Sequence, residues 1–324
     1  KRQVLPSFTL SGLAAGSLHF FRVTATNDGG ESFSTPVVAV RTPESGDPAD
    51  MLIVDGFDRL DQDALIPQWE SSALGTAQRM FLERMNRYDY TVEHALALAA
   101  CGVSFDGAMN EAVVAGDVTL DTYTAVDWFS GEDSTADAAL DAAERAALAA
   151  YLDTGGRLLL SGADVAYDLD AQGRDPAFML DYLKAGYAGD EGAGSTFASV
   201  PGSLLGEVSG TLDDGTGSTY RVDAPDRLSA AADAQVALTY ASGAPAALVY
   251  DGDFRTVYLG FPFEAVVSPS GRRDLACAAA GYLLDTGTPT AIETERLIDP
   301  GFEAGLAQDA WVVSAPGGEG VVTH

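Results

Sequence analysis

The stretch Arg157-Leu-Leu-Leu-Ser-Gly-Ala-Asp164 decides the fold class of this chain. Residues 157–160 follow Gly155-Gly156 and are mostly apolar, which is typical of a short strand buried on both faces. After Ser161 the pattern becomes that of a helix, with Asp164 close to its first turn. A strand, a tight turn and a helix in this order predict an open α/β sheet. Ligands and catalytic groups of such sheets usually follow the carboxyl ends of the strands.

The same alternation of strand and helix extends on both sides of this stretch. Further strands are expected at 51–55, 113–114, 124–129 and 256–261, and helices at 76–85, 92–100, 137–152 and 272–284. Residues 186–250 differ, because they are rich in Gly, Ser, Thr and Asp, and their short strands are expected to extend one edge of the sheet in antiparallel orientation. We therefore predict a mostly parallel, doubly wound α/β domain over residues 51–287.

The first 42 residues have a different pattern, with alternating strands around the turn Asn27-Asp-Gly-Gly30. The segment Leu13-Ala-Ala-Gly-Ser-Leu-His-Phe-Phe-Arg-Val-Thr-Ala-Thr-Asn27-Asp-Gly-Gly-Glu-Ser32 resembles the last strands of a fibronectin type III domain. His19 stands where that family usually has its corner tyrosine. The resemblance implies that residues 1–42 are the C-terminal strands of a β-sandwich that begins upstream. A polar linker rich in Pro and Gly is expected at 43–50.

The C-terminal segment, residues 288–324, resembles the opening strand of a carbohydrate-binding jelly roll. The resemblance rests on Asp299-Pro-Gly-Phe-Glu303 and on Trp311, with Asp299 in place of the family's usual asparagine. It implies that a second β-sandwich domain starts here.

The α/β region, about 51–286, resembles the class I glutamine amidotransferase-like proteins of the flavodoxin-like group. Gly155-Gly-Arg-Leu-Leu-Leu-Ser-Gly-Ala163 falls where that family has its nucleophile strand and elbow, and Gly260-Phe-Pro-Phe-Glu264 falls at its last strand. In true amidotransferases the elbow holds a cysteine activated by a histidine that a glutamate orients. This elbow holds Ser161, and His94 lies far along the chain from the family's catalytic histidine. The resemblance therefore implies that this region has the amidotransferase-like fold but lacks the Cys-His-Glu triad of the true amidotransferases.

Polar side chains follow four of the expected strands. Because the carboxyl ends of parallel strands meet at one edge of a sheet, we expect them to lie close together. The set is Asp55, Asp58, Arg59, Glu132, Asp133, Ser134, Ser161, Asp164 and Glu264. Glu132 and Asp164 are the candidate catalytic acid and base, since acid–base chemistry on a sugar needs two carboxyls with separated pKa values. Asp55, Asp58, Arg59, Ser134, Ser161 and Glu264 are the candidate ligand-binding residues.

Two other interpretations of these residues stay open. The acids could be unrelated, solvated loop ends, because loops are generally polar. Ser161 with His94 could form a serine nucleophile and its base, although a small residue also simply fits a tight turn.

Metal binding has little support in the sequence. Carboxylates can hold a hard divalent ion, but two Cys and three His scattered along the chain do not form a zinc site. The stretch Asp168-Leu-Asp-Ala-Gln-Gly-Arg-Asp175 resembles the front half of an EF-hand loop, yet Met179 stands where the closing glutamate belongs. We predict no metal site and no cofactor, with calcium as the one ion left open.

The charge balance limits the partners. Eighteen basic residues against 48 acidic ones give a net charge of -30. Such a surface repels nucleic acid and anionic membranes, so neither is an expected partner. Adaptation to a salty medium explains the excess of acids, since salt screens self-repulsion; calcium binding by some carboxylates is the competing explanation. No apolar run approaches the length of a membrane span, so membrane insertion is not expected.

Three further residues bear on function. Cys101 and Cys277 lie in Ala-rich helical contexts, where buried thiols are the default interpretation and a disulfide is the alternative. Trp69 follows Ile66-Pro67 and is the tryptophan best placed to line a pocket. With the resemblances, these features predict a secreted or cell-surface modular protein. Its α/β domain would be a non-catalytic accessory module that binds polysaccharide or cell-wall glycan, or holds neighbouring domains of a longer chain. The alternative is a carboxylate-dependent hydrolase acting on glycans or cell-wall amides.

Overall fold

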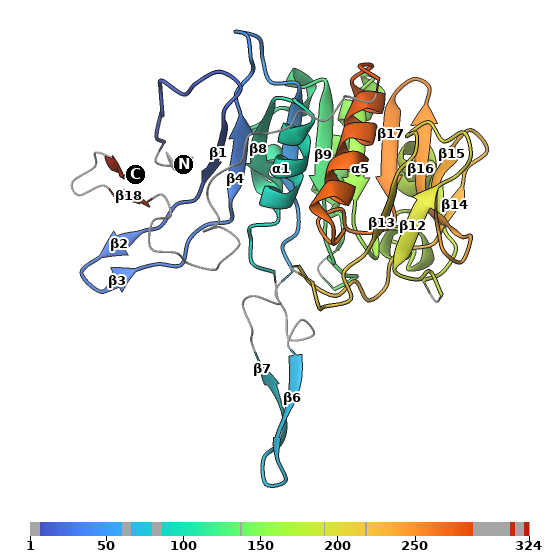
Figure 1. Cartoon of the computed structure of the whole chain (residues 1–324), viewed down its shortest axis with the longest axis horizontal. Helices are drawn as coiled ribbons and strands as arrows, with labels where there is room; N and C mark the ends of the chain where they lie inside the picture. Colours follow the sequence, from blue (N-terminus) through green and yellow to red (C-terminus); the bar gives the residue numbers. More distant parts are fainter. Residues whose placement is uncertain are drawn as a thin grey trace.

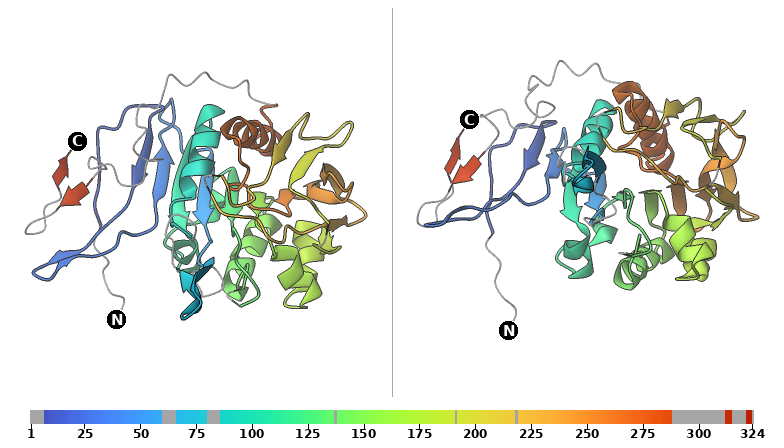
Figure 2. Two further views of the ribbon diagram at one scale, coloured as in Figure 1. Left: turned by 60° about the horizontal axis from the view of Figure 1, so that its bottom comes forward. Right: turned by 90° about the horizontal axis from the view of Figure 1, so that it is seen from below.

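A computed structural model of the chain describes residues 7–59, 66–79, 86–136, 138–190, 192–217, 219–287, 312–314 and 321–323. Its body is one 11-stranded sheet with helices on both faces (Figures 1 and 2). Five central strands run parallel in the order β8 (Phe105–Met109), β5 (Met51–Asp55), β9 (Ala125–Phe129), β10 (Arg157–Ser161) and β17 (Arg255–Leu259). The predicted α/β class with a parallel central sheet is confirmed.

Beyond β17 the sheet continues in antiparallel orientation. The added strands are β16 (Pro245–Asp251), β15 (Gln235–Tyr240), β12 (Thr196–Ser199) and β13 (Ser209–Thr211). The prediction that residues 186–250 extend one edge is therefore confirmed. A separate two-stranded sheet, β11 (Ala185–Tyr187) with β14 (Leu228–Ala230), belongs to the same region.

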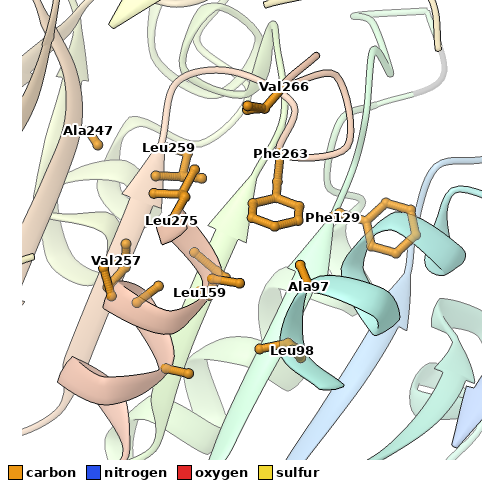
Figure 3. Packing of buried hydrophobic residues seen from close by; sticks show 14 of the residues in the cluster. Ala97, Leu98, Phe129, Leu159, Ala247, Val257, Leu259, Phe263, Val266 and Leu275 are labelled. Carbon is orange, nitrogen blue, oxygen red and sulfur yellow. The ribbon is translucent and has the colours of Figure 1, made fainter. Parts of the chain in front are cut away.

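Helices cover the two faces because successive residues of a buried strand point to opposite sides. On one face α1 (Thr91–Ala100) and α5 (Pro269–Leu283) pack on Ile53, Leu159 and Val257. Figure 3 shows part of this core, with Leu98 and Leu275 on the two helices. The other face is covered by α2 (Asn110–Val114), η3 (Leu120–Thr122), α3 (Ala142–Asp153), η4 (Tyr167–Ala171), α4 (Pro176–Phe178) and η5 (Met179–Leu183).

The N-terminal strands join the other edge of the same sheet. β1 (Leu18–Phe21) pairs with β4 (Val38–Arg41), and β4 pairs with β8 through Arg41 and Phe105. A small hairpin, β2 (Thr26–Asn27) with β3 (Gly30–Glu31), extends from this pair. Ala39 of β4 is fully buried in the core that α1 and α5 cover. In the described part of the chain these strands extend the α/β sheet, and no β-sandwich forms around them.

Two expected elements are wrong. Residues 76–79, expected to start a helix, lie in β7 (Gly75–Arg79), which pairs with β6 (Ile66–Ser71) in a hairpin that projects from the body (Figure 1). The rest of that expected helix, residues 80–85, lies outside the described residues. Val113 and Val114, expected in a strand, end helix α2. Both segments are short, and in short segments contacts with the rest of the chain override local preference.

The C-terminal segment is described only at β18 (Val312–Ser314) and β19 (Val321–Thr323), which pair with each other. The other residues of the expected jelly-roll start, Trp311 included, lie outside the described residues, so that expectation stays a prediction. Among the helices that the structure describes, none has the length and apolar character needed to cross a membrane.

Candidate functional site

The carboxyl edge of the parallel sheet holds a buried network of charges centred on His94 of α1. The Nδ1 atom of His94 lies 2.8 Å from Oδ2 of Asp127 in β9, and its Nε2 atom lies 3.4 Å from Oε2 of Glu264 after β17. The Tyr220 hydroxyl donates a 2.5 Å hydrogen bond to the other oxygen of Glu264. The side chains of His94 and Glu264 are 0% exposed.

The two carboxylates keep this histidine charged. Burial alone would lower the pKa of His94, but the attraction of Asp127 and Glu264 and their hydrogen bonds outweigh it and raise the pKa to about 10. At neutral pH His94 is therefore an imidazolium that donates to both acids. An imidazolium cannot accept a proton, so His94 cannot serve there as a general base. Its ring is also stacked on Phe129, with the ring centres 4.3 Å apart.

Asp55 ends β5 and lies in the same buried region. Its Oδ1 atom accepts a hydrogen bond from the Phe57 backbone N–H at 3.1 Å, and its Oδ2 atom accepts one from the Thr91 hydroxyl at 3.3 Å. Burial, together with repulsion from the nearby Glu264, raises the pKa of Asp55 to about 7. The rings of Phe57, Tyr90 and Tyr220 pack on one another, with their centres 5.2 to 5.6 Å apart. Asp55 is 3% exposed and is therefore closed to solvent.

The loops after β5 and β9 are tied together by their own polar groups. Asp133 accepts hydrogen bonds from the backbone N–H groups of Asp58 at 3.4 Å and of Arg59 at 2.8 Å. The Arg59 guanidinium donates to the carbonyl oxygen of Glu132 at 3.0 Å, and the Asp58 carboxylate accepts from the Asn110 amide at 3.2 Å. The structure thus uses Asp58 and Asp133 to fix these loops.

The two serines among the candidates are involved in local structure. Ser134 caps its own turn, because its hydroxyl accepts a hydrogen bond from the Ala136 backbone N–H at 3.3 Å. Ser161 is 0% exposed, and its hydroxyl has no hydrogen-bond partner among the described residues. The nitrogens of His94 are engaged by carboxylates instead. The alternative of a Ser161–His94 nucleophile and base is therefore wrong.

Glu132 and Asp164, the candidate acid and base, are both half-buried and lie near Arg59. Burial raises the pKa of Glu132 to about 8, although its Oε1 atom accepts a hydrogen bond from the Asp223 backbone N–H at 3.1 Å. Burial raises the pKa of Asp164 to about 6, against the attraction of Arg59. Asp164 also adds repulsion to Glu132, so the two carboxyls are close enough to influence each other. Burial thus raises both pKa values towards neutrality, that of Glu132 more than that of Asp164.

Asp164 lies in the turn that follows β10. It has a φ of +59°, in the left-handed region that residues other than glycine rarely adopt, where the chain turns from β10 into the next helix. Asp and Asn tolerate this conformation better than most residues. The turn after β10 therefore carries a half-buried carboxyl side chain.

Neither a metal site nor an EF-hand loop is formed by the described residues. No three His, Cys, Asp or Glu side chains in that part of the chain gather in a way that could hold a metal ion. Asp168, at the start of the EF-hand-like stretch, is fully buried and pairs with Arg174 at 2.7 Å. Asp170 accepts a hydrogen bond from the Tyr187 backbone N–H at 2.7 Å. Both acids are thus engaged inside the fold.

Cys101 and Cys277 form a disulfide that joins α1 to α5, with their Cα atoms 5.3 Å apart. The default interpretation of buried free thiols is wrong, and the alternative that the sequence left open is correct. The two cysteines are 176 residues apart in the sequence, so only the fold could reveal the pairing.

Asp127 and Tyr220 were missed as members of the network. Asp127 lies in the middle of an otherwise apolar strand, and a charge at such a position is a signal, because a buried charge needs a partner. Tyr220 lies in an irregular segment of the inserted region and is 44 residues from Glu264, so its sequence context gives no such signal.

No protein-family model matches this chain, and no curated protein matches it. Solved structures similar to it include an exo-β-1,4-mannosidase from an Opitutaceae bacterium, at 14% identity and a TM-score of 0.42, covering 74% of this chain. This chain spans only 36% of that enzyme. A cytoplasmic protein from Salmonella typhimurium has 11% identity and a TM-score of 0.49, covering 74% of this chain and 100% of its own. A glutamine amidotransferase from Thermotoga maritima has 11% identity and a TM-score of 0.39, covering 75% of this chain and 100% of its own. The similar structures thus include amidotransferase-like folds, at low identity.

Proposed function

We propose that the α/β unit is a non-catalytic binding module of a secreted protein that acts on polysaccharide or cell-wall material. The proposal rests mainly on one observation: carboxylates at the sheet edge are buried or hydrogen-bonded to other groups of the protein. Asp55, Asp127 and Glu264 are buried with His94, and Asp133 holds two backbone N–H groups. A catalytic acid or base must come within hydrogen-bond reach of its substrate. Buried and engaged groups do not meet that condition.

An exposed tryptophan supports the binding role. Trp69 in β6 is 66% exposed, whereas Trp128 is fully buried. It lies opposite Thr76 of β7, on the hairpin that projects from the body (Figure 1). A large apolar ring in water costs free energy unless something covers it. An indole beside a hydroxyl suits a sugar ring, which has an apolar face for stacking and hydroxyls at its rim.

The disulfide between Cys101 and Cys277 supports a location outside the cytoplasm, since disulfides persist in oxidising compartments. The proposal also includes the neighbouring domains. Residues 288–324 would be the start of a carbohydrate-binding domain, on the motif quoted above, whereas strands β1 and β4 of the N-terminal segment belong to the α/β sheet itself. The high negative charge would suit a salty medium.

The proposal is tested by binding to insoluble cellulose, chitin, mannan and peptidoglycan in a sedimentation assay with the full chain. We expect at least one of these materials to retain the protein. Trp69→Ala should weaken retention by about tenfold, the effect of losing roughly 1.4 kcal/mol of stacking. Phe33→Ala is the matched control, because Phe33 is an aromatic side chain that is 94% exposed but lies outside the hairpin. Failure of every material to retain the chain would overturn the proposal.

A carboxylate-dependent hydrolase is the second candidate, and the pair Glu132 and Asp164 favours it. Their pKa values of about 8 and about 6 are separated in the way that an acid and a base at neutral pH require. In this role Glu132 would protonate the leaving group, and Asp164 would activate water or attack directly. Release of reducing ends or amines should then be highest between about pH 6 and 8. Glu132→Gln and Asp164→Asn should each abolish it and leave retention on the material unchanged. Absence of product from the full chain would exclude this candidate.

A further inference from the structure

The antiparallel edge of the sheet carries a hollow of about 450 Å³, on strands other than those that hold the charged network. Nine residues of β15, β12, β13 and their ends line it, and their pairing arranges them as three rows across three strands. The middle row turns its side chains inward, since Phe197 and Tyr240 are buried in the core. The hollow therefore lies above the backbone of the middle row, between the two outer rows.

The two outer rows carry hydroxyl groups and small side chains. They are Thr196, Thr211 and Ala241 in one row and Ala198, Ser209 and Thr239 in the other. Five of these six residues are exposed, and Thr239 is half-buried. Within the described part of the chain none of the four hydroxyls makes a hydrogen bond to another protein group. Neighbouring strands are about 4.8 Å apart and the rows about 7 Å apart, and residues with hydroxyl groups hold four of the six positions in these rows.

The floor of this hollow is held rigidly from the other side. Phe197 stacks on Phe261 with ring centres 4.6 Å apart. The Tyr240 hydroxyl donates to the carbonyl oxygens of Asp226 and Gly260, both at 3.0 Å. The outer edge of β13 is also occupied, because the Val267 backbone N–H donates to the Thr211 carbonyl at 2.9 Å. A ligand can therefore reach the face of these strands but not the edge of β13. Because this face is rigid, it loses little conformational entropy on binding.

The lining decides the class of ligand. None of the nine residues is Asp, Glu, Lys, Arg or His, although the chain as a whole has a net charge of -30. A cation would find better partners in the many surface carboxylates, and the overall charge repels anions. Unpartnered hydroxyls act as both donors and acceptors, which matches the hydroxyls of a neutral polyhydroxylated molecule. The volume is within the range of small-molecule sites.

We propose that this hollow, formed by the outer face of β15, β12 and β13, is a binding site for a neutral oligosaccharide. The inference rests on the proposed function and adds to it a second site with its class of ligand. The hollow and the Trp69 hairpin are separate surfaces, so each can be altered without touching the other.

The test measures binding of neutral and uronic-acid-containing oligosaccharides to the full chain by calorimetry. The double variant Thr196→Val/Thr211→Val removes two hydroxyls, keeps the side-chain shape and suits a strand. We expect it to bind neutral oligosaccharides about tenfold more weakly, the effect of losing two ordinary hydrogen bonds. Ala198→Leu, which fills the hollow, should weaken binding at least as much. Thr119→Val makes the same change at an exposed threonine beside η3 and should have no effect.

The outcomes separate this inference from the proposed function. Loss of binding in the hollow variants, with Thr119→Val unchanged and the melting temperatures preserved, would support the site. If only Trp69→Ala loses binding and the hollow variants bind like the parent, the hollow is not a site but the module still binds glycan. Binding of uronic-acid oligosaccharides as tight as that of neutral ones would overturn the ligand class. Absence of binding to any oligosaccharide or insoluble material would overturn both proposals.

Discussion

At the scale of single residues, the buried carboxyl of Asp55 has the clearest consequence. Its pKa is about 7 in the folded protein and about 3.8 in an unfolded chain. A raised carboxyl pKa means that the folded state binds the proton more tightly than the unfolded state. The stability that this proton provides is present at low pH and is lost as pH rises through about 7. His94 also contributes stability that is lost as pH rises, but at higher pH, because its pKa is raised from 6.5 to about 10.

Replacing Asp55 with Asn should therefore flatten the pH dependence of stability between about pH 4 and 7. The amide stays neutral and can still accept from the Phe57 backbone N–H. At pH 8 the variant should be more stable than the parent, by at most about 4 kcal/mol if the whole pKa difference is expressed. Urea unfolding at several pH values measures this.

Asp28→Asn is the control for this experiment, since Asp28 is an exposed carboxyl in the β2–β3 turn. It should keep the pH dependence of the parent. An Asp55→Asn protein whose stability falls with pH as steeply as that of the parent would show that Asp55 is ionised throughout, contrary to its buried setting.

The same residues show what the sequence could and could not predict at this scale. Asp55, Glu132 and Glu264 follow buried strands, and that position alone placed them at one edge of the sheet. Their partners depend on packing between elements far apart in the chain, such as His94 and Glu264, which are 170 residues apart. Such a long-range contact determines whether a carboxylate can reach a substrate or is bound to another side chain of the protein. Local sequence patterns do not predict contacts of this kind.

At the scale of elements, α1 and α5 lie side by side on one face of the sheet although they come from the two ends of the α/β domain (Figure 1). Cys101 follows the last residue of α1, and Cys277 lies within α5. Their disulfide therefore closes a loop of 176 residues through the core. A crosslink over so long a loop removes much conformational entropy from the unfolded chain, by about 5 kcal/mol at most in the chain-entropy model.

Reduction should lower the melting temperature of the protein, and thermal unfolding with and without a reductant measures the effect. A double variant, Cys101→Ala/Cys277→Ala, should melt at a lower temperature than the oxidised parent and should not respond to reductant. A parent protein that melts at the same temperature in both conditions, with the thiols shown to be free after reduction, would contradict the stabilising role of this bond.

Element prediction from the sequence succeeded where burial imposes a pattern. Four of the five central strands were expected because their residues are largely apolar and helices cover both of their faces, and β5 is buried at all five positions. The fifth, β8, reads Phe-Asp-Gly-Ala-Met, is only partly buried and was not predicted. The β6–β7 hairpin lacks such a pattern, because it projects from the body and only pairing between its own strands defines it (Figure 1). Helix α2 spans just five residues, too few for a helical period to appear.

At the scale of the whole molecule, the net charge of -30 on 324 residues is the dominant property. Folding brings these charges closer together than they are in the unfolded chain, so their repulsion opposes the folded state. Among the described residues many of the few basic side chains are already in local pairs, such as Arg255 with Asp251 and Asp285. Repulsion among the remaining carboxylates can therefore be reduced only by ions of the medium.

Added sodium chloride should therefore raise the melting temperature, with most of the rise below about 0.5 M. The Debye length falls from about 30 Å at 0.01 M to about 10 Å at 0.1 M and about 3 Å at 1 M, so screening is nearly complete by then. Sucrose is the control, because it favours burial without screening charge. A melting temperature that stays flat at low salt and rises only above about 1 M would point to water-structuring effects of the salt. In that case charge repulsion would not limit stability, and adaptation to a salty medium would lose its physical basis.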